Sequence, residues 1–179
     1  MQMIQKISLI SALAENLVIG INNRLPWKMP ADWENFRKVT KDKSFIMGKK
    51  SYLAQDKLLS SNRNLILAHT PDFELCSNCI MVKSVAEALT TLKNEDEIFI
   101  LGGASIFSQT IHLANYMYLT IIHSEFEGDA YFPEYDERHW QVKRSDFHYK
   151  DVTNPYDYTF LELERITKDI DDSYSRGIY

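Results

Sequence analysis

The stretch IFILGGASIF, residues 98–107, decides the fold class of this chain. It opens with a short apolar run of strand length, Gly102 and Gly103 follow, and a helix is predicted to begin at Ala104. A strand that passes directly into a helix is half of a βα unit, from which parallel sheets are built. The paired glycines lack Cβ atoms, so a flat or charged ligand can approach the backbone at the turn. The stretch therefore indicates an α/β domain with a ligand-binding edge.

The same alternation of strand and helix extends along the preceding sequence. Short apolar runs of strand character lie at residues 7–14, 45–47, 65–67, 80–82 and 98–101. Helices are predicted to begin at Pro30, to cover residues 84–92, which open with a Ser-x-x-Glu capping box, and to cover residues 104–111. Such alternation predicts a mostly parallel sheet with helices on its faces.

The last third of the chain has a different pattern. Three strands are predicted, at residues 116–122, 140–149 and 158–163, with no convincing helix between them. The predicted fold class is α/β, with a central mixed, mostly parallel sheet of about eight strands, antiparallel C-terminal strands and about four flanking helices. We expect one domain over residues 1–165, and a frayed or appended polar tail over residues 166–179.

Composition limits the classes of function. The net charge of −5 is not concentrated in any block of like charges, which disfavours nucleic acid and anionic membranes as partners. No apolar run approaches the length of a membrane-spanning helix, and the N-terminal residues lack the small-residue site of a cleavable signal, so we expect a cytoplasmic protein. The two cysteines, in the motif C-S-N-C at residues 76–79, lack a second pair and a histidine at ligand spacing. We expect them to be structural or incidental, and we predict no metal site.

The stretch LPWKMPADWENF, residues 25–36, places a carboxylate among apolar and aromatic neighbours. It follows a segment from Val18 to Met29 without helical or strand periodicity, which predicts a long loop, and long loops in compact domains are often functional. From Pro30 onward, Asp32 and the aromatic residues after it have helical spacing. The local sequence leaves two roles open for Asp32, a functional acid or a first-turn acid that stabilises the helix dipole.

A second glycine junction lies in FIMGKKS, residues 45–51, where a short strand meets Gly48 and two lysines. A strand that passes through glycine into a helix start, with lysines beside it, is suited to a phosphate group, although a solvated basic turn has the same pattern. Neither junction contains the full G-x-G-x-x-G of a dinucleotide fold. Two such junctions in one small α/β domain point to a ligand with several phosphates, lying across the carboxyl ends of the strands.

These motifs together resemble the dihydrofolate reductase family, particularly its bacterial single-domain form. The resemblance runs from Lys6 to Glu164 and rests on five motifs in order, ISLISALAENLVIGINNRLPW, PADWENF, FIMGKKSY, IFILGGASIF and MYLTIIHSEFEGDAYFP. It implies reduction of 7,8-dihydrofolate to 5,6,7,8-tetrahydrofolate by NADPH, with hydride transfer to carbon 6 of the pterin ring and protonation of nitrogen 5. It further implies a role in one-carbon metabolism, possible binding of antifolate inhibitors, and a monomer.

The resemblance assigns a substrate site. Asp32 takes the position of the family's single acid, where a carboxylate can accept two N–H bonds from the pterin and where burial would raise its pKa. Thr120 would hold this acid and the pterin amino group, although a strand threonine alone is an ordinary β-former. Trp27 would hold an ordered water near the pterin, and Leu25 would belong to the mobile loop that covers the nicotinamide. The other implied contacts, which without the resemblance include ordinary core positions, are Ile10, Ala12, Trp33, Phe36, Leu59 and Leu101.

The resemblance also assigns a cofactor site for NADPH. Lys49 stands where an arginine is common, so it would give the ribose 2′-phosphate a charge partner without arginine's planar fork. His69 could approach the same phosphate, although a lone histidine is as readily plain surface. The implied cofactor residues are Ala12, Ile19, Gly48, Lys49, Lys50, Ser51, Leu67, Ala68, His69, Lys83, Leu101, Gly102, Gly103, Ala104, Ser105, Ile106, Phe107 and Gln109.

The sequence departs from the family pattern in the segment AQDKLLSSNRN, residues 54–64. The arginine that clamps the glutamate tail of the substrate aligns with Asn62, and the nearest arginine, Arg63, comes one residue later. In a strand that step turns a side chain to the opposite face, so a loop shift would be needed to restore Arg63, and otherwise Lys57 or a neighbouring lysine would be an imperfect substitute. Phe107 replaces a common tyrosine, from which we expect a tuning effect.

Three functions remain open at this point. The leading hypothesis is a dihydrofolate reductase, and the lost tail clamp motivates a second, an NADPH-dependent reductase of another pterin or of a riboflavin-pathway pyrimidine. The third is a non-catalytic pterin- or nucleotide-binding protein. Retention of Asp32 with Thr120 favours the first, because the pyrimidine reductase needs no pterin-binding acid, and the two glycine junctions argue against the third.

Overall fold

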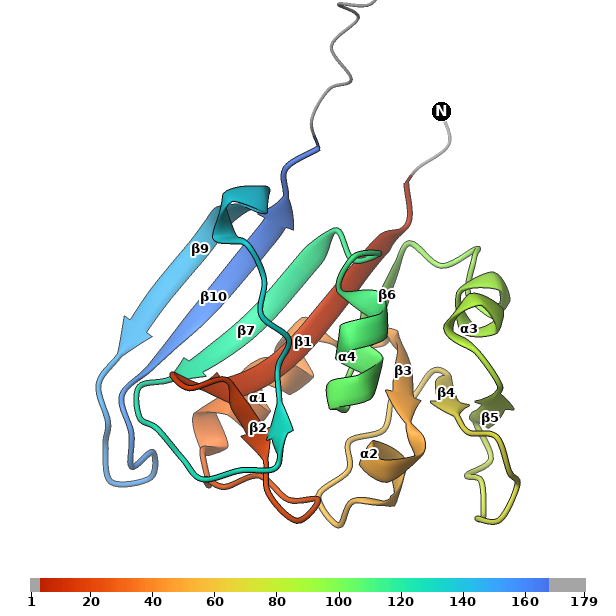
Figure 1. The fold of residues 1–179 in the computed structure, drawn as a ribbon, viewed down its shortest axis with the longest axis horizontal. Coiled ribbons are helices and arrows are strands. Elements are labelled where there is room, and N and C mark those ends of the chain that lie inside the picture. Colours follow the sequence, from red (N-terminus) through yellow and green to blue (C-terminus); the bar gives the residue numbers. More distant parts are fainter. Residues whose placement is uncertain (1–3, 168–179) are drawn as a thin grey trace, which may run out of the picture.

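A single eight-stranded sheet runs through the centre of the computed structural model, which describes residues 4–167 (Figure 1). The strands lie in the order β5 (Cys79–Val82), β4 (Asn64–Leu67), β3 (Ser44–Gly48), β6 (Glu97–Ile100), β1 (Lys6–Ala14), β7 (Tyr116–Ile122), β10 (Tyr158–Arg165) and β9 (Trp140–His148). Neighbours from β5 to β7 are parallel, and β10 is antiparallel to both β7 and β9. The prediction of a mixed sheet with an antiparallel C-terminal end is therefore confirmed.

Four α-helices in the described part of the chain cover the two faces of this sheet. On one face, α3 (Val85–Thr91) and α4 (Ala104–Thr110) contribute to a core cluster with the central strands. On the other face lie α1 (Pro30–Val39) and α2 (Lys49–Leu53), whose aromatic residues pack on a second cluster. Figure 1 shows α4 in front of the sheet and α1 behind it. A short 3₁₀-helix, Glu137–His139, precedes β9.

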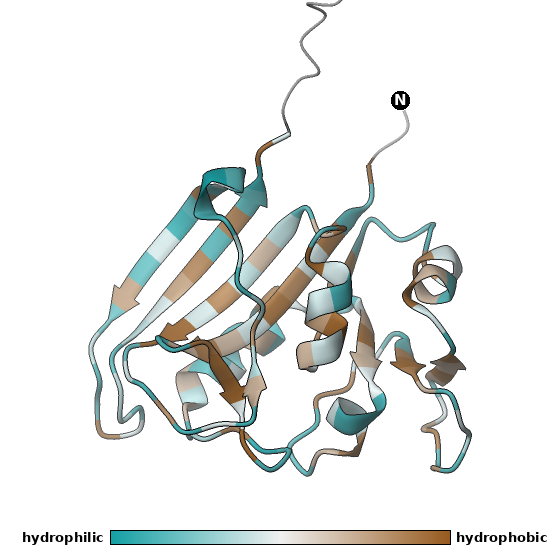
Figure 2. Cartoon of the chain, in the orientation of Figure 1, coloured by the Kyte–Doolittle hydropathy of each residue, from teal (hydrophilic) through white to brown (hydrophobic). Residues whose placement is uncertain are grey.

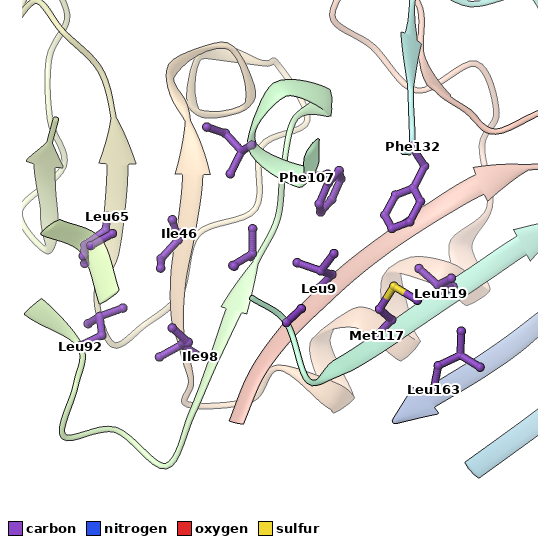
Figure 3. Close-up of a cluster of buried hydrophobic side chains, with 14 of the residues drawn as sticks. Leu9, Ile46, Leu65, Leu92, Ile98, Phe107, Met117, Leu119, Phe132 and Leu163 are labelled. Atoms are coloured by element: carbon purple, nitrogen blue, oxygen red, sulfur yellow. The ribbon is translucent and has the colours of Figure 1, made fainter. Parts of the chain in front are cut away.

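The core follows the hydropathy of the strands. Leu9, Ile98 and Ile100 are fully buried in the central strands, and Figure 3 shows Phe107 and Phe132 over the same layer, with ring centroids 5.0 Å apart. Most residues of β9, at the edge of the sheet, are exposed. Figure 2 shows this contrast as brown central strands against a mostly teal β9. The central parallel strands are buried and therefore have continuous apolar sequences, whereas the edge strand β9 is largely exposed to solvent and therefore has a more polar sequence.

The expectation of a long loop over residues 18–29 was wrong at its start. The residues Val18–Gly20 form β2, which pairs antiparallel with β8 (Ala130–Tyr131) in a small second sheet. The pairing is extended by a bond of 2.8 Å from Phe132 N to Leu17 O. The partner strand lies more than a hundred residues away in sequence, so periodicity within the segment could not show it.

Two further expectations concern the cysteines and the tail. Cys76 and Cys79 are joined by a disulfide at the start of β5, a pairing that the sequence did not lead us to predict. Of the expected tail, residues 166 and 167 follow β10, and residues 168–179 lie outside the described part of the chain. No helix among the described residues is long and apolar enough to span a membrane.

Candidate active site

A cavity of about 230 Å³ opens between α1, the segment that carries β2, and the carboxyl ends of β1 and β6. This is the end of the molecule where β2 and α2 lie in Figure 1. The carboxyl ends of parallel strands are the usual binding edge of an α/β sheet. The sequence-predicted residues that line this cavity are Ile10, Ala12, Ile19, Leu25, Asp32, Trp33, Phe36, Ser51, Leu101, Gly103, Ala104 and Phe107.

Asp32 is one of three acids that line this cavity, with Asp56 and Asp129, and it is the one on α1. It lies in the first turn of α1, and its Oδ1 accepts a hydrogen bond of 2.6 Å from Thr120 Oγ1 of the buried strand β7. Burial raises the pKa of Asp32 from 3.8 to about 6, because desolvation penalises the charged carboxylate more than the bond from Thr120 stabilises it. A carboxyl group with this pKa can exchange a proton with a bound ligand near neutral pH.

Two separate contacts fix the geometry of this pair. Thr120 lies opposite Ala12 of β1 and Phe160 of β10, so the register of three strands sets its position. The first turn of α1 has no side-chain cap from Met29 and instead uses Asn154, whose Oδ1 accepts a bond of 2.9 Å from Ala31 N. Asn154 is buried, and it is held by Asp151 at 3.1 Å. The position of Asp32 relative to the sheet therefore depends on contacts with Thr120 and Asn154, both far away in sequence.

Trp27 does not line the cavity and belongs to the third core cluster, against which the cavity residues Ala12 and Leu25 pack. Its ring is buried and contacts Phe126 edge-to-face with centroids 5.1 Å apart. The Trp27 Nε1 is a buried donor with no hydrogen-bond partner among residues 4–167. Because buried donors are nearly always paired, this group is available to a ligand or an ordered water.

The apolar wall of the cavity includes Leu58, the neighbour of the predicted residue Leu59. Leu58 lines the cavity, whereas Leu59 does not line it and is 38% exposed. The segment around them, between α2 and β4, contains turns and bends and no regular element. Without fixed periodicity, a count along the sequence does not determine which side chain turns inward.

The same segment turns both candidate tail-binding residues away from the cavity. Arg63 forms an ion pair with Glu95, to whose Oε1 its Nε donates at 3.1 Å, and the side chain of Asn62 is exposed. Of the cations that the sequence nominated for the tail, Lys57 is the one that lines the cavity, with its Nζ 4.6 Å from the ring centroid of Tyr52. The loop shift that would have restored Arg63 to the cavity is not present.

The two glycine junctions meet side by side. Gly48 N donates a bond of 2.7 Å to Gly102 O, and the peptide bond between Gly102 and Gly103 is cis. Gly102 has φ of 98°, and a Cβ at this position would lie 2.6 Å from the ring of Phe107, so no other residue fits there. A Cβ on Gly103 would be in ordinary van der Waals contact with Ser51 Oγ at 3.5 Å, and both residues line the cavity.

The remaining cofactor candidates near the two glycine junctions include both exposed and buried side chains. Lys49 and the exposed Lys50 open α2, and Lys49 pairs with Asp72 at 2.5 Å. Ala68 and Ile106 are buried and Leu67 is half-buried in β4, and none of the three lines the cavity. The exposed candidates are His69, Lys83, Ser105 and Gln109. Two lysines, a serine hydroxyl and an open glycine backbone form a donor set that fits the phosphates of a dinucleotide.

Comparison with known proteins decides the family. The dihydrofolate reductase family model matches residues 6–165. The chain is 39% identical to dihydrofolate reductase from Bacillus subtilis (strain 168) over 159 residues, 89% of this chain and 94% of that protein. It is 38% identical to the Staphylococcus haemolyticus enzyme over 161 residues, 90% and 96% of the two chains. The chain belongs to the dihydrofolate reductase family.

A solved structure supports this membership. Dihydrofolate reductase from Enterococcus faecalis, complexed with NADP(H) and RAB-propyl, superposes with a TM-score of 0.81 at 28% sequence identity, over 89% of this chain and 96% of that one. The dihydrofolate reductase family and fold predicted from the five motifs are thereby confirmed. The assignment of individual residues to substrate and cofactor stays a prediction.

Several residues that line the cavity or hold its walls in this dihydrofolate reductase family member were not predicted. Asn154 could not be found from sequence, because its partner Ala31 is 123 residues away. Asp129 and Ala130 line the cavity from the β8 side, which follows from the β2–β8 pairing that periodicity missed. The polar residues Asn23 and Arg24 lie beside Leu25 in the loop already expected to be functional, and that neighbourhood was the signal that could have identified them.

Proposed function

We propose that this chain reduces 7,8-dihydrofolate to 5,6,7,8-tetrahydrofolate with NADPH, and that Asp32 is its catalytic acid. The observation that carries the proposal is the hydrogen-bonded pair of Asp32 and Thr120 on the inner wall of a cavity that reaches Gly103. A flat heterocycle with adjacent ring and amino N–H groups is matched by a carboxylate, which accepts both bonds. Asp32 lines the cavity together with Ile10, Trp33 and Phe36, so its carboxylate can anchor such a ring beside apolar side chains.

Besides anchoring the ring, the Asp32 carboxyl group takes part in proton transfer. Its raised pKa of about 6 keeps a fraction protonated near neutral pH, so it can support delivery of the proton that the pterin nitrogen takes. The hydroxyl of Thr120 holds the acid in one orientation. When bound, NADPH supplies the hydride. Leu25 and its neighbours, which line the cavity from the β2 side, exclude water from the reacting atoms.

The proposed cofactor contacts extend from the cavity to the surface. The backbone at Gly103 and the Ser51 hydroxyl lie where a pyrophosphate and its ribose can be bound, and Lys49 and Lys50 supply cations for phosphate groups. We further propose that the enzyme acts as a cytoplasmic monomer and that its cavity binds antifolate inhibitors. The absence of any concentrated block of like charges in the sequence supports the first proposal, and the cavity in which Asp32 lies beside Trp33 and Phe36 supports the second.

One observation favours a second candidate, reduction of a pterin without a glutamate tail. Arg63 is engaged by Glu95, so the described cavity presents Lys57 and Arg24 and no bidentate clamp from the segment 54–64. Parallel steady-state assays that follow NADPH oxidation, one with dihydrofolate and one with a tail-less dihydropterin, separate the candidates. We expect turnover of both with a preference for dihydrofolate. Equal kcat/KM values would favour the tail-less pterin, and NADPH binding without turnover would show a binding protein.

A further inference from the structure

The cation at the start of α2 already has an anionic partner. Lys49 Nζ lies 2.5 Å from Asp72 Oδ1 and 5.3 Å from the ring centroid of Phe73. The hydrogen bond from Lys49 lowers the pKa of Asp72, so its carboxylate is ionised at neutral pH. The positive charge that would select a ribose 2′-phosphate is therefore balanced by a full negative charge at contact distance.

Asp72 is held at this position by the residues that follow it. The ring of Phe73 packs against Tyr52 of α2, with centroids 5.6 Å apart. The buried Tyr52 hydroxyl donates to Glu74 O and accepts from Cys76 N, both at 3.0 Å. Three contacts with Tyr52, from Phe73, Glu74 and Cys76, join the β4–β5 connection to α2. The backbone that carries Asp72 is therefore held close to the start of α2.

A carboxylate and a lysine favour different forms of the same cofactor. In dinucleotide sites an acidic side chain accepts a hydrogen bond from the free ribose 2′-hydroxyl of NADH, whereas a cation pairs with the 2′-phosphate of NADPH. A dianionic phosphate placed on Lys49 would meet Asp72 as a like charge, and lysine has no planar fork to strengthen the phosphate contact. The pair offers an acceptor to the hydroxyl and a cation to the phosphate, so it discriminates weakly between the two.

We propose that this enzyme also uses NADH as a hydride donor, and that Asp72 is the residue that permits it. This inference rests on the proposed function. In the reaction a hydride leaves carbon 4 of the reduced nicotinamide for carbon 6 of dihydrofolate, and nitrogen 5 takes a proton. The hydride carries two electrons, so NADH is oxidised to NAD⁺ and dihydrofolate, after it takes the proton, is reduced to tetrahydrofolate.

Three variants of the full-length chain test the role of the pair. Asp72→Asn removes the carboxylate charge that repels the 2′-phosphate and accepts from the 2′-hydroxyl, so we expect the ratio of NADPH to NADH affinity to rise about fivefold, the upper range for an exposed ion pair. Lys49→Gln should weaken NADPH binding about fivefold and change NADH binding by less than about twofold. Asp136→Asn is the matched control, because it changes the same charge in an acid that is paired with Arg138 and directly precedes the 3₁₀-helix before β9, and β9 lies at the opposite side of the sheet from α2 (Figure 1).

The measurement combines binding with turnover. Dissociation constants for NADPH and NADH are obtained by quenching of intrinsic tryptophan fluorescence, and kcat/KM is obtained for each nucleotide with dihydrofolate. Detectable turnover with NADH, together with the opposite shifts of the two affinities in Asp72→Asn and none in Asp136→Asn, supports the inference. An unchanged affinity ratio in Asp72→Asn, or turnover with NADPH alone, overturns it. Absence of turnover with either nucleotide would instead refute the proposed function, while the affinity ratio would still report on Asp72.

Discussion

The inner and outer ends of the cavity are built in different ways. At the inner end, Asp32 and Thr120 belong to a helix and a buried strand, and they meet at 2.6 Å as the resemblance implied. At the outer end, residues 54–63 form no helix or strand, and Arg63 turns to Glu95. Contacts between side chains on helices and strands can be predicted from a family resemblance, because strand register and helix position fix where those side chains lie. Contacts from an irregular segment cannot be predicted in this way, because an offset of one residue changes which side chain faces the ligand.

Removing the acid tests the inner end and should have the largest effect. We expect Asp32→Asn to lower kcat with dihydrofolate at pH 7 by about a hundredfold or more, because a positioned acid typically contributes that much, while NADPH affinity changes little. The loss should be smaller at low pH, where solvent supplies the proton. Steady-state kinetics from pH 5 to pH 8 with an NADPH binding titration measure both. Near-normal rates at pH 7 would show that another group supplies the proton.

The same variant should stabilise the protein. Between pH 3.8 and about 6 the folded state holds the Asp32 proton that the unfolded state has lost, so the free energy of unfolding falls as pH rises through this window. Above it the burial cost is constant, at most about 3 kcal/mol. Asp32→Asn removes this cost, so urea unfolding at pH 7 should show a gain that disappears below pH 4. A gain independent of pH would mean that burial does not raise the pKa of Asp32.

Rebuilding the clamp tests the outer end. We expect Lys57→Arg to lower KM for dihydrofolate about tenfold, because Lys57 lines the cavity and an arginine there can pair with a tail carboxylate through two bonds, and to leave KM for a tail-less dihydropterin unchanged. Asn62→Arg adds an arginine at an exposed position that does not line the cavity and serves as the control. If Arg63→Gln instead raised KM for dihydrofolate, Arg63 would reach the substrate after all, and the contrast between the two ends would fail.

Loosening α1 should have the smallest effect on turnover. Asn154→Ala removes the acceptor for Ala31 N, so we expect a loss of about 1 to 2 kcal/mol in the free energy of unfolding and a several-fold fall in kcat as Asp32 shifts. Thr153→Ala is the control, because it removes a bond to Asp151 and keeps the contact between Asn154 and the helix. Urea unfolding and KM for NADPH, which should not change, complete the test. A variant with unchanged kcat would show that the helix start does not position the acid.

Much of the fold could be predicted because local patterns matched local structure. The strand over residues 116–122, the capping box at Ser84 and the helix start at Pro30 all lie where the sequence indicated. The missing strand β2 and the inward-facing Leu58 were different, since the first depends on a distant partner and the second on a segment without a period.

The sequence by itself determined the alternation of elements, the glycine junctions, the family resemblance and the presence of an acid with an apolar surround. These depend on residue type and short-range spacing, which a linear chain contains in full. Tertiary structure alone decided that Thr120 bonds to Asp32, that Asn154 caps α1, that Arg63 pairs with Glu95 and that Asp72 balances Lys49. Each of these contacts joins residues at least 23 positions apart, and only the folded backbone brings their polar atoms within bonding distance.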